Sequence, residues 1–383
     1  MTGIHPPKRP ESVPLRILYV VARFLPERGG TEIHTDEVAK RMSQRGAHVT
    51  VLATSREPGL PREEWDEGVC IRRVRAWPRR RDYFFAPELA TEIRAIKPDL
   101  LHCQGYHTFV APLAMIAALR ASIPYVVTFH SGGHSSRLRV LMRPLQAHLL
   151  RPLLVRARAL VAASDFEADL FSRRLHISPD DFAIIPSGIN LPNTSEPVEP
   201  ADPGLILSIG RLESYKGHDR IIEALPALRR RHPYVRLRIV GSGPYEPRLR
   251  RLAAKLNVAD AVDITPLASG NRRELAVLLN RAAVVTALSQ YESQGLAVQE
   301  AIGLGRPVVV NEGSALDELG VYPNVRTISG RAGSDEVADA VSRVLHAPPV
   351  EAPAMQTWDD CVDALVELYR AAMSEKTGVS RLS

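Results

Sequence analysis

The feature that most constrains the fold is an alternation of short β-rich runs with longer segments of helical period, which occurs twice along the chain. Strands that are apolar on both faces and joined by helices are typical of parallel sheets covered on both sides. The sequence therefore predicts an α/β protein with two Rossmann-like, doubly wound domains. The predicted strands are 15–21, 48–53, 99–103, 124–129 and 159–163 in the first half, and 205–210, 235–241, 262–265, 283–287 and 306–310 in the second.

A proline-rich and acidic segment without periodicity separates the two halves, and such a segment is typical of an exposed linker. Two domains of this kind leave a cleft at the carboxyl ends of their strands, where ligands bind. The predicted limits are a flexible N-terminus over 1–14, an N-terminal domain over 15–190, the linker over 191–204, a C-terminal domain over 205–350, a helical segment over 351–373 and a tail over 374–383.

Composition excludes several classes of protein. The three cysteines, Cys70, Cys103 and Cys361, form no Cys-x-x-Cys pair, so we expect neither a disulfide framework nor a zinc site. The polar start lacks the apolar region of a signal peptide, and no apolar run reaches the about 20 residues that span a bilayer. We therefore expect a cytoplasmic protein. The net charge of +6 makes the surface attractive to phosphates and anionic lipids.

Two cations lie in the sequence GRLESYKGHD, where Gly210 ends a predicted strand and a helix begins near His218. Arg211 and Lys216 then occupy the strand-to-helix loop. A pyrophosphate needs a metal or fixed cations, and an arginine fork with a lysine charge supplies the latter. Because the chain has no Asp-x-Asp triplet, we expect no metal ion and no other cofactor. The alternative is that both residues are solvated loop charges.

A second loop lies in SQYESQGLAVQEAIGLG, which predicts a turn and then a short helix. Backbone N–H groups of Gly295 and Leu296 at the helix start suit a second phosphate. Glu300 is placed to accept hydrogen bonds from a ribose diol, and Glu292 to reach sugar hydroxyls or a developing positive charge. The alternative is that both glutamates are ordinary surface acids.

Two glycine-containing segments follow strands of the N-terminal half. In TFHSGGHS, His130 directly follows a strand and is placed to orient a sugar or an acceptor, although a structural role is the alternative. In RFLPERGGTE, Gly29 and Gly30 precede a helix for which Thr31 is the predicted N-cap. This loop is not the GxGxxG of dinucleotide-binding proteins, which argues against NAD binding.

The motifs GRL-x3-KG, IVGSGP, E-x7-E and EA-x-G-x-G-x-PVV, together with the Gly-Gly loop, resemble those of the family 4 retaining glycosyltransferases of GT-B fold. The resemblance runs from roughly Leu15 to Tyr369. It implies two domains facing each other across a cleft, with acceptor in the first and nucleotide-sugar in the second. It also implies that the terminal helix packs back on the first domain. The implied reaction is metal-independent transfer of a hexose-type sugar from a UDP- or GDP-sugar to an acceptor hydroxyl, with retention.

The resemblance also implies roles for single residues. Arg211 and Lys216 match the pyrophosphate-binding pair, Glu292 the sugar-contacting glutamate, Glu300 the ribose-binding glutamate and His130 the histidine that contacts the transferred sugar. The predicted site comprises His130, Glu292, Arg211 and Lys216 as catalytic residues, Gly210, Arg211, Lys216, Gly241, Gly295, Leu296 and Glu300 around the donor, and Gly29, Gly30 and Thr31 at the acceptor and phosphate.

The chain departs from the family at one point. The family commonly has E-G-F-G where this chain has Glu292-Ser293-Gln294-Gly295. Ser293 and Gln294 are therefore expected to make the donor pocket more polar than usual, and the identity of the sugar does not transfer from relatives.

Two basic stretches lie in the N-terminal half, over 71–85 and 137–159. The second interleaves apolar residues with arginine at helical spacing, as in helices that lie on anionic membranes and meet lipid-linked acceptors. The alternative is a solvated helix with an apolar stripe facing the core. No nucleic-acid-binding motif is present, so the expected partners are a nucleotide-sugar, a glycan, lipid-linked or small-molecule acceptor, and the inner face of the membrane.

Rival functions fit the same pattern of motifs. A nucleotide-sugar epimerase or a phosphorylase uses a similar two-domain arrangement, and a non-catalytic nucleotide-sugar-binding protein belongs to a different class. Release of nucleoside diphosphate in proportion to the acceptor glycosylated distinguishes a transferase from all three.

Overall fold

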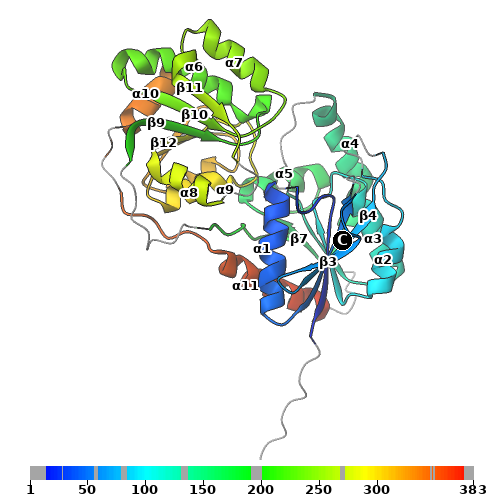
Figure 1. Ribbon diagram of the computed structural model, residues 1–383. Coiled ribbons are helices and arrows are strands. Elements are labelled where there is room, and N and C mark those ends of the chain that lie inside the picture. The colour runs from blue at the N-terminus through cyan, green and yellow to red at the C-terminus, as the bar shows by residue number, and fades with distance from the viewer. Residues whose placement is uncertain are drawn as a thin grey trace, which may run out of the picture. The chain divides into compact units, whose positions relative to one another are not determined.

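The computed structural model describes residues 14–27, 29–55, 59–78, 84–130, 137–190, 201–267, 272–345, 347 and 350–374. These residues form two α/β parts, each built on a mainly parallel sheet with helices on both faces (Figure 1). This is the Rossmann-like architecture that the sequence predicts. Within the described residues no helix has the length and apolarity needed to cross a bilayer.

The first sheet has eight strands in the order β3-β4-β2-β1-β5-β6-β7-β8. Strand β1 is central and almost entirely buried, and it runs parallel to β2 and β5. Strand β3, at the edge of the sheet, is antiparallel to its neighbour β4. The strands are β1 (Arg16–Val21), β2 (His48–Ser55), β3 (Glu63–Asp66), β4 (Val69–Arg75), β5 (Leu100–Gln104), β6 (Tyr125–Thr128), β7 (Ala159–Ala162) and β8 (Phe182–Ile184).

Helices connect these strands over both faces of the sheet. Helix α1 lies on one face, whereas α2 and α3 pack together on the other, as right-handed crossovers to opposite sides of β1 require (Figure 1). The helices are α1 (Gly30–Gln44), α2 (Leu89–Ile96), α3 (Val110–Arg120), α4 (Arg137–Leu154) and α5 (Asp165–Leu175), followed by the 3-10 turn η1 (Pro179–Asp181).

The second sheet has six parallel strands in the order β11-β10-β9-β12-β13-β14. Strand β9 begins inside the predicted linker, because Asp202 already pairs with Ala282 of β12. The remainder of that linker, over 191–200, lies outside the described residues. The strands are β9 (Asp202–Ile209), β10 (Arg236–Val240), β11 (Val262–Thr265), β12 (Ala282–Ala287), β13 (Val308–Asn311) and β14 (Val325–Ile328).

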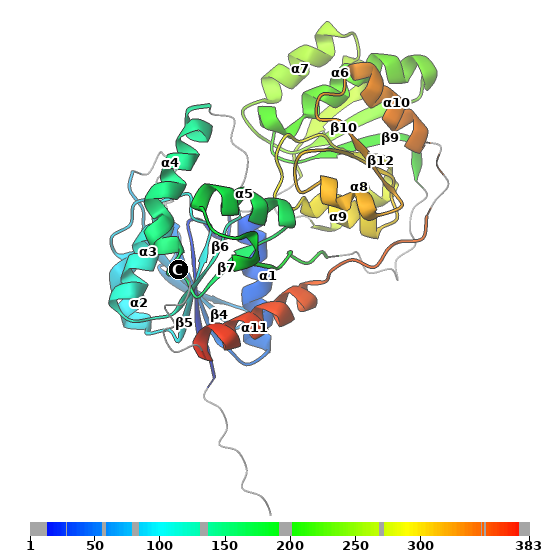
Figure 2. The same cartoon turned by 180° about the vertical axis from the view of Figure 1, so that it is seen from behind.

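Two apolar clusters cover the faces of the second sheet. One joins α6, α7 and α10 to the sheet, and the other joins α8 and α9 to it. Figures 1 and 2 show these two groups of helices on opposite sides of the sheet. The helices are α6 (His218–Arg231), α7 (Glu246–Lys255), α8 (Arg272–Arg281), α9 (Leu296–Gly303) and α10 (Ser334–Leu345), with 3-10 turns η2 (Ser214–Lys216), η3 (Ala259–Ala261) and η4 (Asp317–Val321).

The terminal helix α11 (Trp358–Ser374) ends against the first sheet. The hydroxyl of Tyr369 lies 3.0 Å from that of Tyr19 in β1 and 2.6 Å from Nδ1 of His102 in β5. All three side chains are buried, and burial lowers the pKa of His102 to about 3. The neutral imidazole thus forms part of a polar network that holds the end of the helix.

By its internal contacts the chain divides into two compact units. The first comprises residues 31–127 with the described residues up to Glu27 and from Leu368 onward, and the second comprises residues 29–30 and the described residues within 128–367. The second sheet lies wholly in the second unit.

Candidate functional site

The second sheet reverses its direction of winding between β9 and β12. The chain leads from β9 through α6 to β10 on one side, and from β12 through α9 to β13 on the other. Ligands of open α/β sheets bind beyond the carboxyl ends of the strands at such a point. The two loops here, 210–217 after β9 and 288–295 after β12, carry most of the predicted donor residues.

The first of these loops is shaped by close backbone packing. A Cβ on Gly241, at the end of β10, would lie 1.9 Å from the carbonyl oxygen of Gly210. The N–H of Leu212 donates to Ser242 O at 2.9 Å, and Gly217 adopts φ 72° where α6 begins. Gly241 is thus required by the packing of neighbouring strand ends, whereas Gly210 is favoured by its φ of 150°, because a Cβ there would have no neighbour closer than 3.7 Å.

Lys216 and Glu292 join the two loops directly. The Lys216 ammonium forms an ion pair with Oε1 of Glu292, and the side chains are only 14% and 21% exposed. The hydroxyl of Ser289 lies 3.2 Å from the same carboxylate oxygen and 3.3 Å from Lys216 O. The structure therefore brings together two residues that the sequence separates by 76 positions.

Arg211 and His218 lie at opposite ends of the first loop. The exposed Arg211 donates from Nη2 to the hydroxyl of Tyr215 at 2.8 Å. His218 is buried, and desolvation lowers its pKa to about 4. Because Nε2 faces the carbonyl of Arg211 at 3.3 Å, Nε2 carries the proton and Nδ1 accepts from the hydroxyl of Ser208 at 2.8 Å. A neutral histidine thus fixes the main chain at Arg211.

Glu300 lies in α9, where its buried carboxylate forms an ion pair with Arg272 at the start of α8. Gly295, at φ 79°, precedes the helix, and Leu296 is its first residue. The predicted positions of Gly295, Leu296 and Glu300 are those observed. Their contacts with a donor remain predictions, and sequence reasoning missed Arg272.

Hydrogen bonds of Asn311 support the loop 288–295. Nδ2 of Asn311, at the end of β13, donates to Ser289 O at 3.3 Å, and Oδ1 accepts from Arg220 of α6 at 2.6 Å. Sequence reasoning missed these residues as well. The available signal was a polar residue directly after the apolar run of β13, at the carboxyl edge of the sheet.

Gln294 differs from expectation. It was expected to add polarity to the donor pocket, but its buried carboxamide bonds the main chain of Ser187 at 3.0 and 2.7 Å. A buried amide is stable only when its donors and acceptors are paired, which is the physical reason for this arrangement.

His130 follows β6 with φ 43°, a left-handed conformation uncommon for residues other than glycine. It is preceded by Phe129, which is buried and stacks on Phe171 with ring centroids 4.1 Å apart. The packing of Phe129 thus holds the backbone next to His130, whose predicted sugar contact remains a prediction. The neighbouring glycines at 132–133 lie outside the described residues.

The loop after β1 corrects one prediction. Helix α1 begins at Gly30, so Thr31 lies inside its first turn rather than at the N-cap. The carbonyl of Thr31 accepts from the hydroxyl of Thr35 at 2.8 Å. Gly29 lies just before the helix, and the predicted ligand contacts of this loop remain predictions.

The basic stretch 71–85 is only partly a surface feature. Arg73 is buried in β4 and donates to Leu25 O at 2.8 Å and to the carboxylate of Glu64. Arg72 pairs with Glu63 at 3.0 Å. Both arginines therefore hold the edge of the first sheet together, and residues 79–83 lie outside the described residues.

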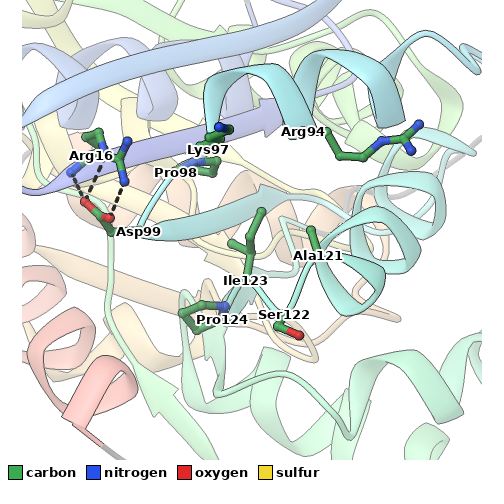
Figure 3. A pocket seen from close by; sticks show the side chains of 9 residues that line it. All are labelled: Arg16, Arg94, Lys97, Pro98, Asp99, Ala121, Ser122, Ile123 and Pro124. Atoms are coloured by element: carbon green, nitrogen blue, oxygen red, sulfur yellow. Dashed lines mark hydrogen bonds and ion pairs between the residues drawn. The ribbon is translucent and has the colours of Figure 1, made fainter.

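A hollow of about 460 Å³ lies at the amino-terminal edge of the first sheet (Figure 3). Arg16 at the start of β1 pairs there with Asp99 at 2.8 Å, and the pKa of this carboxyl is lowered by the hydrogen bond. Ligands of such sheets bind at the opposite edge, so we do not take this hollow as the functional site.

In the described part of the chain, no group of three or more His, Cys, Asp or Glu side chains is arranged to hold a metal ion.

Two protein families match the chain in succession. Residues 28–192 match the family described as Glycosyltransferase Family 4, and residues 193–356 match Glycosyl transferases group 1. The boundary falls in the predicted linker. Together the two matches cover both sheets except for β1 (Arg16–Val21).

Relatives match over nearly the whole chain. A D-inositol 3-phosphate glycosyltransferase of Nocardiopsis dassonvillei is 29% identical, with 91% of each chain covered. A GDP-mannose:cellobiosyl-diphosphopolyprenol alpha-mannosyltransferase of Xanthomonas campestris is 25% identical, covering 94% of this chain and 97% of the relative.

Solved structures show the same fold. A sucrose-phosphate synthase from Thermosynechococcus elongatus superposes with a TM-score of 0.74 at 21% identity, covering 93% of this chain and 98% of the other. HepE of Anabaena, in complex with UDP and glucose, gives a TM-score of 0.72 at 17% identity, covering 93% and 99%.

Proposed function

Because this chain belongs to the family 4 glycosyltransferases of GT-B fold, we propose that it moves a hexose-type sugar from a UDP- or GDP-sugar to an acceptor hydroxyl with retention of configuration. The observation that carries the proposal is the contact between Lys216 and Glu292 at the switch point of the second sheet. A relative named for GDP-mannose and a structural neighbour holding UDP support a nucleotide-sugar donor.

The loops suggest how the donor is held. Arg211 and Lys216 supply positive charge to the pyrophosphate, and the start of α9 at Gly295 and Leu296 offers main-chain donors to a phosphate. Glu300 receives the ribose hydroxyls, with Arg272 orienting its carboxylate. These fixed cations balance the charge of the diphosphate, so the proposed reaction uses neither a metal ion nor another cofactor.

The proposed reaction is a front-face displacement. The bond between the anomeric carbon and the phosphate oxygen breaks as the acceptor oxygen attacks from the same face, and the acceptor proton passes to the leaving phosphate. Arg211 and Lys216 stabilise the departing negative charge, and His130 and Glu292 hold the sugar. Glu292 is a poor covalent nucleophile, because Lys216 stabilises its negative charge.

The acceptor is proposed to arrive at an anionic membrane along α4. Leu141, Leu145 and Leu149, spaced four residues apart, are 75%, 48% and 67% exposed, and Met142 lies beside them. Arginines of the same helix, such as Arg143, suit lipid phosphates. We therefore propose a cytoplasmic protein that associates with the inner face of the membrane. Leu145→Asp combined with Leu149→Asp is expected to abolish sedimentation with vesicles containing anionic lipid, and equal sedimentation of the variant would contradict the assignment.

The experiment that tests the function combines binding with product analysis. We expect a UDP- or GDP-sugar, but not an ADP-sugar, to raise the melting temperature, since a ligand that binds only the native state stabilises it. Nucleoside diphosphate should form in proportion to the glycosylated acceptor, and EDTA should not change the rate. A requirement for inorganic phosphate would indicate a phosphorylase, and rearranged nucleotide-sugar without release would indicate an epimerase.

Lys216→Ala is expected to lower kcat/KM about a thousandfold, or roughly 4 kcal/mol of transition-state stabilisation, because the leaving phosphate loses its nearest cation. Lys255→Ala removes an exposed lysine at the end of α7 and serves as the matched control. If both variants react and bind donor like the wild type, the proposed donor site is wrong.

A further inference from the structure

The carboxamide of Gln294 makes a two-point contact with the main chain of Ser187. The N–H of Ser187 donates to Oε1 at 3.0 Å, and Nε2 donates to Ser187 O at 2.7 Å. Both residues are buried, and both belong to the second compact unit. Because one point accepts and the other donates, the contact fixes which way the carboxamide faces.

The same carboxamide also reaches α9. Nε2 donates to Oε1 of Gln299 at 3.2 Å, so both of its hydrogens are directed to acceptors. One side chain thus connects three segments, namely the loop after β12, the first turns of α9 and the segment 185–190.

The segment 185–190 is itself held in place by hydrogen bonds to β7 and to the segment before α11. The N–H of Ile185 donates to Ala162 O at 2.9 Å, and that of Ile189 donates to Gln356 O at 3.1 Å. The side chain of Gln356 returns a bond to Pro186 O at 2.9 Å. A Cβ on Gly188 would lie 2.1 Å from the backbone nitrogen of Trp358, so this segment has no room to shift.

The other end of the contact is the loop of the candidate donor site. Glu292 lies two positions before Gln294, and Gly295, which begins α9, lies directly after it. The carbonyl of Glu292 accepts from the N–H of Ala315 at 3.2 Å, and its side chain pairs with Lys216. A shift at Gln294 therefore moves both the carboxylate and the start of the helix.

We propose that Gln294 is a positioning residue that holds the loop 288–295 against the segment 185–190 and thereby presets Glu292 and the start of α9 for the donor. The inference rests on the proposed function of these loops. A site that is held in its binding geometry before the ligand arrives loses less conformational freedom on binding. The effect should therefore appear first in donor affinity.

Two substitutions and a matched control test the proposal. Gln294→Met keeps the length of the side chain and removes both polar points. Gln294→Glu restores them only when protonated, because a carboxylic acid can accept from the N–H of Ser187 and donate to its carbonyl, whereas a carboxylate has no hydrogen to donate. Gln299→Met removes only the third hydrogen bond and leaves the contact with Ser187 intact.

Donor KM and the Kd of UDP and GDP are the first measurements. Gln294→Met should raise both about tenfold, with a smaller fall in kcat, while Gln299→Met stays within about twofold of the wild type. Hydrogen exchange in the full chain should become faster over 288–296 in Gln294→Met and remain unchanged in β10. Wild-type affinity together with wild-type exchange in Gln294→Met would overturn the proposal.

The pH profile of Gln294→Glu gives a signature that general loss of stability does not. Burial raises the pKa of a carboxyl at this position, so the ratio of its kcat/KM to that of the wild type should rise as pH falls from 8 to 5.5. Every titratable group of the wild type is also present in the variant, so pH effects common to both proteins divide out of the ratio. A ratio that does not change with pH would contradict the proposal.

A wild type that binds no nucleotide refutes the proposed function, and the hydrogen-exchange data then still decide whether Gln294 anchors the loop.

Discussion

The loops that follow β1 and β9 hold corresponding places in their sheets, yet their glycines meet different surroundings. A Cβ on Gly217 would lie 2.1 Å from Leu288 O, and this glycine has φ 72°. A Cβ on Gly30 would have no heavy atom of the described residues within 4 Å. The glycine after β9 is therefore required by the packing of the protein itself, whereas a side chain on the glycine after β1 would meet none of the described residues. Open space beside the backbone is what the approach of a ligand requires.

Gly217→Ala tests the first half of this comparison and should have the largest effect. The new methyl group meets a backbone carbonyl and a left-handed φ, so we expect a loss of roughly 3 kcal/mol or more in the free energy of unfolding. Gly46→Ala is the matched control, because φ is 88° there but no heavy atom of the described residues lies within 4 Å of the added Cβ. It should lose about 1 kcal/mol from the backbone conformation alone. Equal losses in calorimetric melting would show that packing at Leu288 is not the cause.

Acidification tests a property shared by α1 and α6, the helices that follow these two loops. His34 in α1 and His218 in α6 are both buried, and desolvation lowers the pKa of each to about 4. The unfolded chain binds these protons near pH 6.5, so stability is retained above that pH and falls as pH drops toward 4. Each histidine contributes roughly 3 kcal/mol to the fall. In His218→Gln the slope of stability against pH should decrease by about one proton, and an unchanged slope would mean that His218 is not buried as a neutral group.

Gly30→Ala should have the smallest effect on stability. Alanine favours a helix more than glycine does and meets no neighbour here, so the free energy of unfolding should change by about 0.5 kcal/mol or less. If the open space serves a ligand, KM for the acceptor or the donor should still rise severalfold. Unchanged steady-state kinetics would remove this loop from the site and leave only the loops of the second sheet.

Much of the fold was predictable because strand and helix periods are local properties of the chain. All ten predicted strands are present, and the helix predicted to begin near His218 begins there. The hairpin of β3 and β4 was missed because Arg72 and Arg73 look like surface charge until their acidic partners are known. Strand β8 has only three residues, and the four residues of β14 include an arginine and are mostly not buried, so neither shows a clear apolar run in the sequence.

The candidate site was predictable to a different extent. Residue types and spacing placed Arg211, Lys216, Glu292 and Glu300 in strand-to-helix loops, because those loops are set by the same local periods. No local property predicts that Lys216 meets Glu292, or that Arg272 meets Glu300, since both pairs depend on the order of strands in the sheet.

The sequence by itself determined the two parallel sheets, the family and the loops that carry polar residues, because periodicity and motif spacing are written along the chain. Tertiary structure alone decided which side chains pair. Gln294 shows the difference most clearly. Its amide is predicted to add polarity to a pocket, but it is hydrogen-bonded to the backbone of Ser187, 107 positions away. A hydrogen bond between residues so far apart in the sequence depends on how the whole unit packs, and no local segment includes both partners.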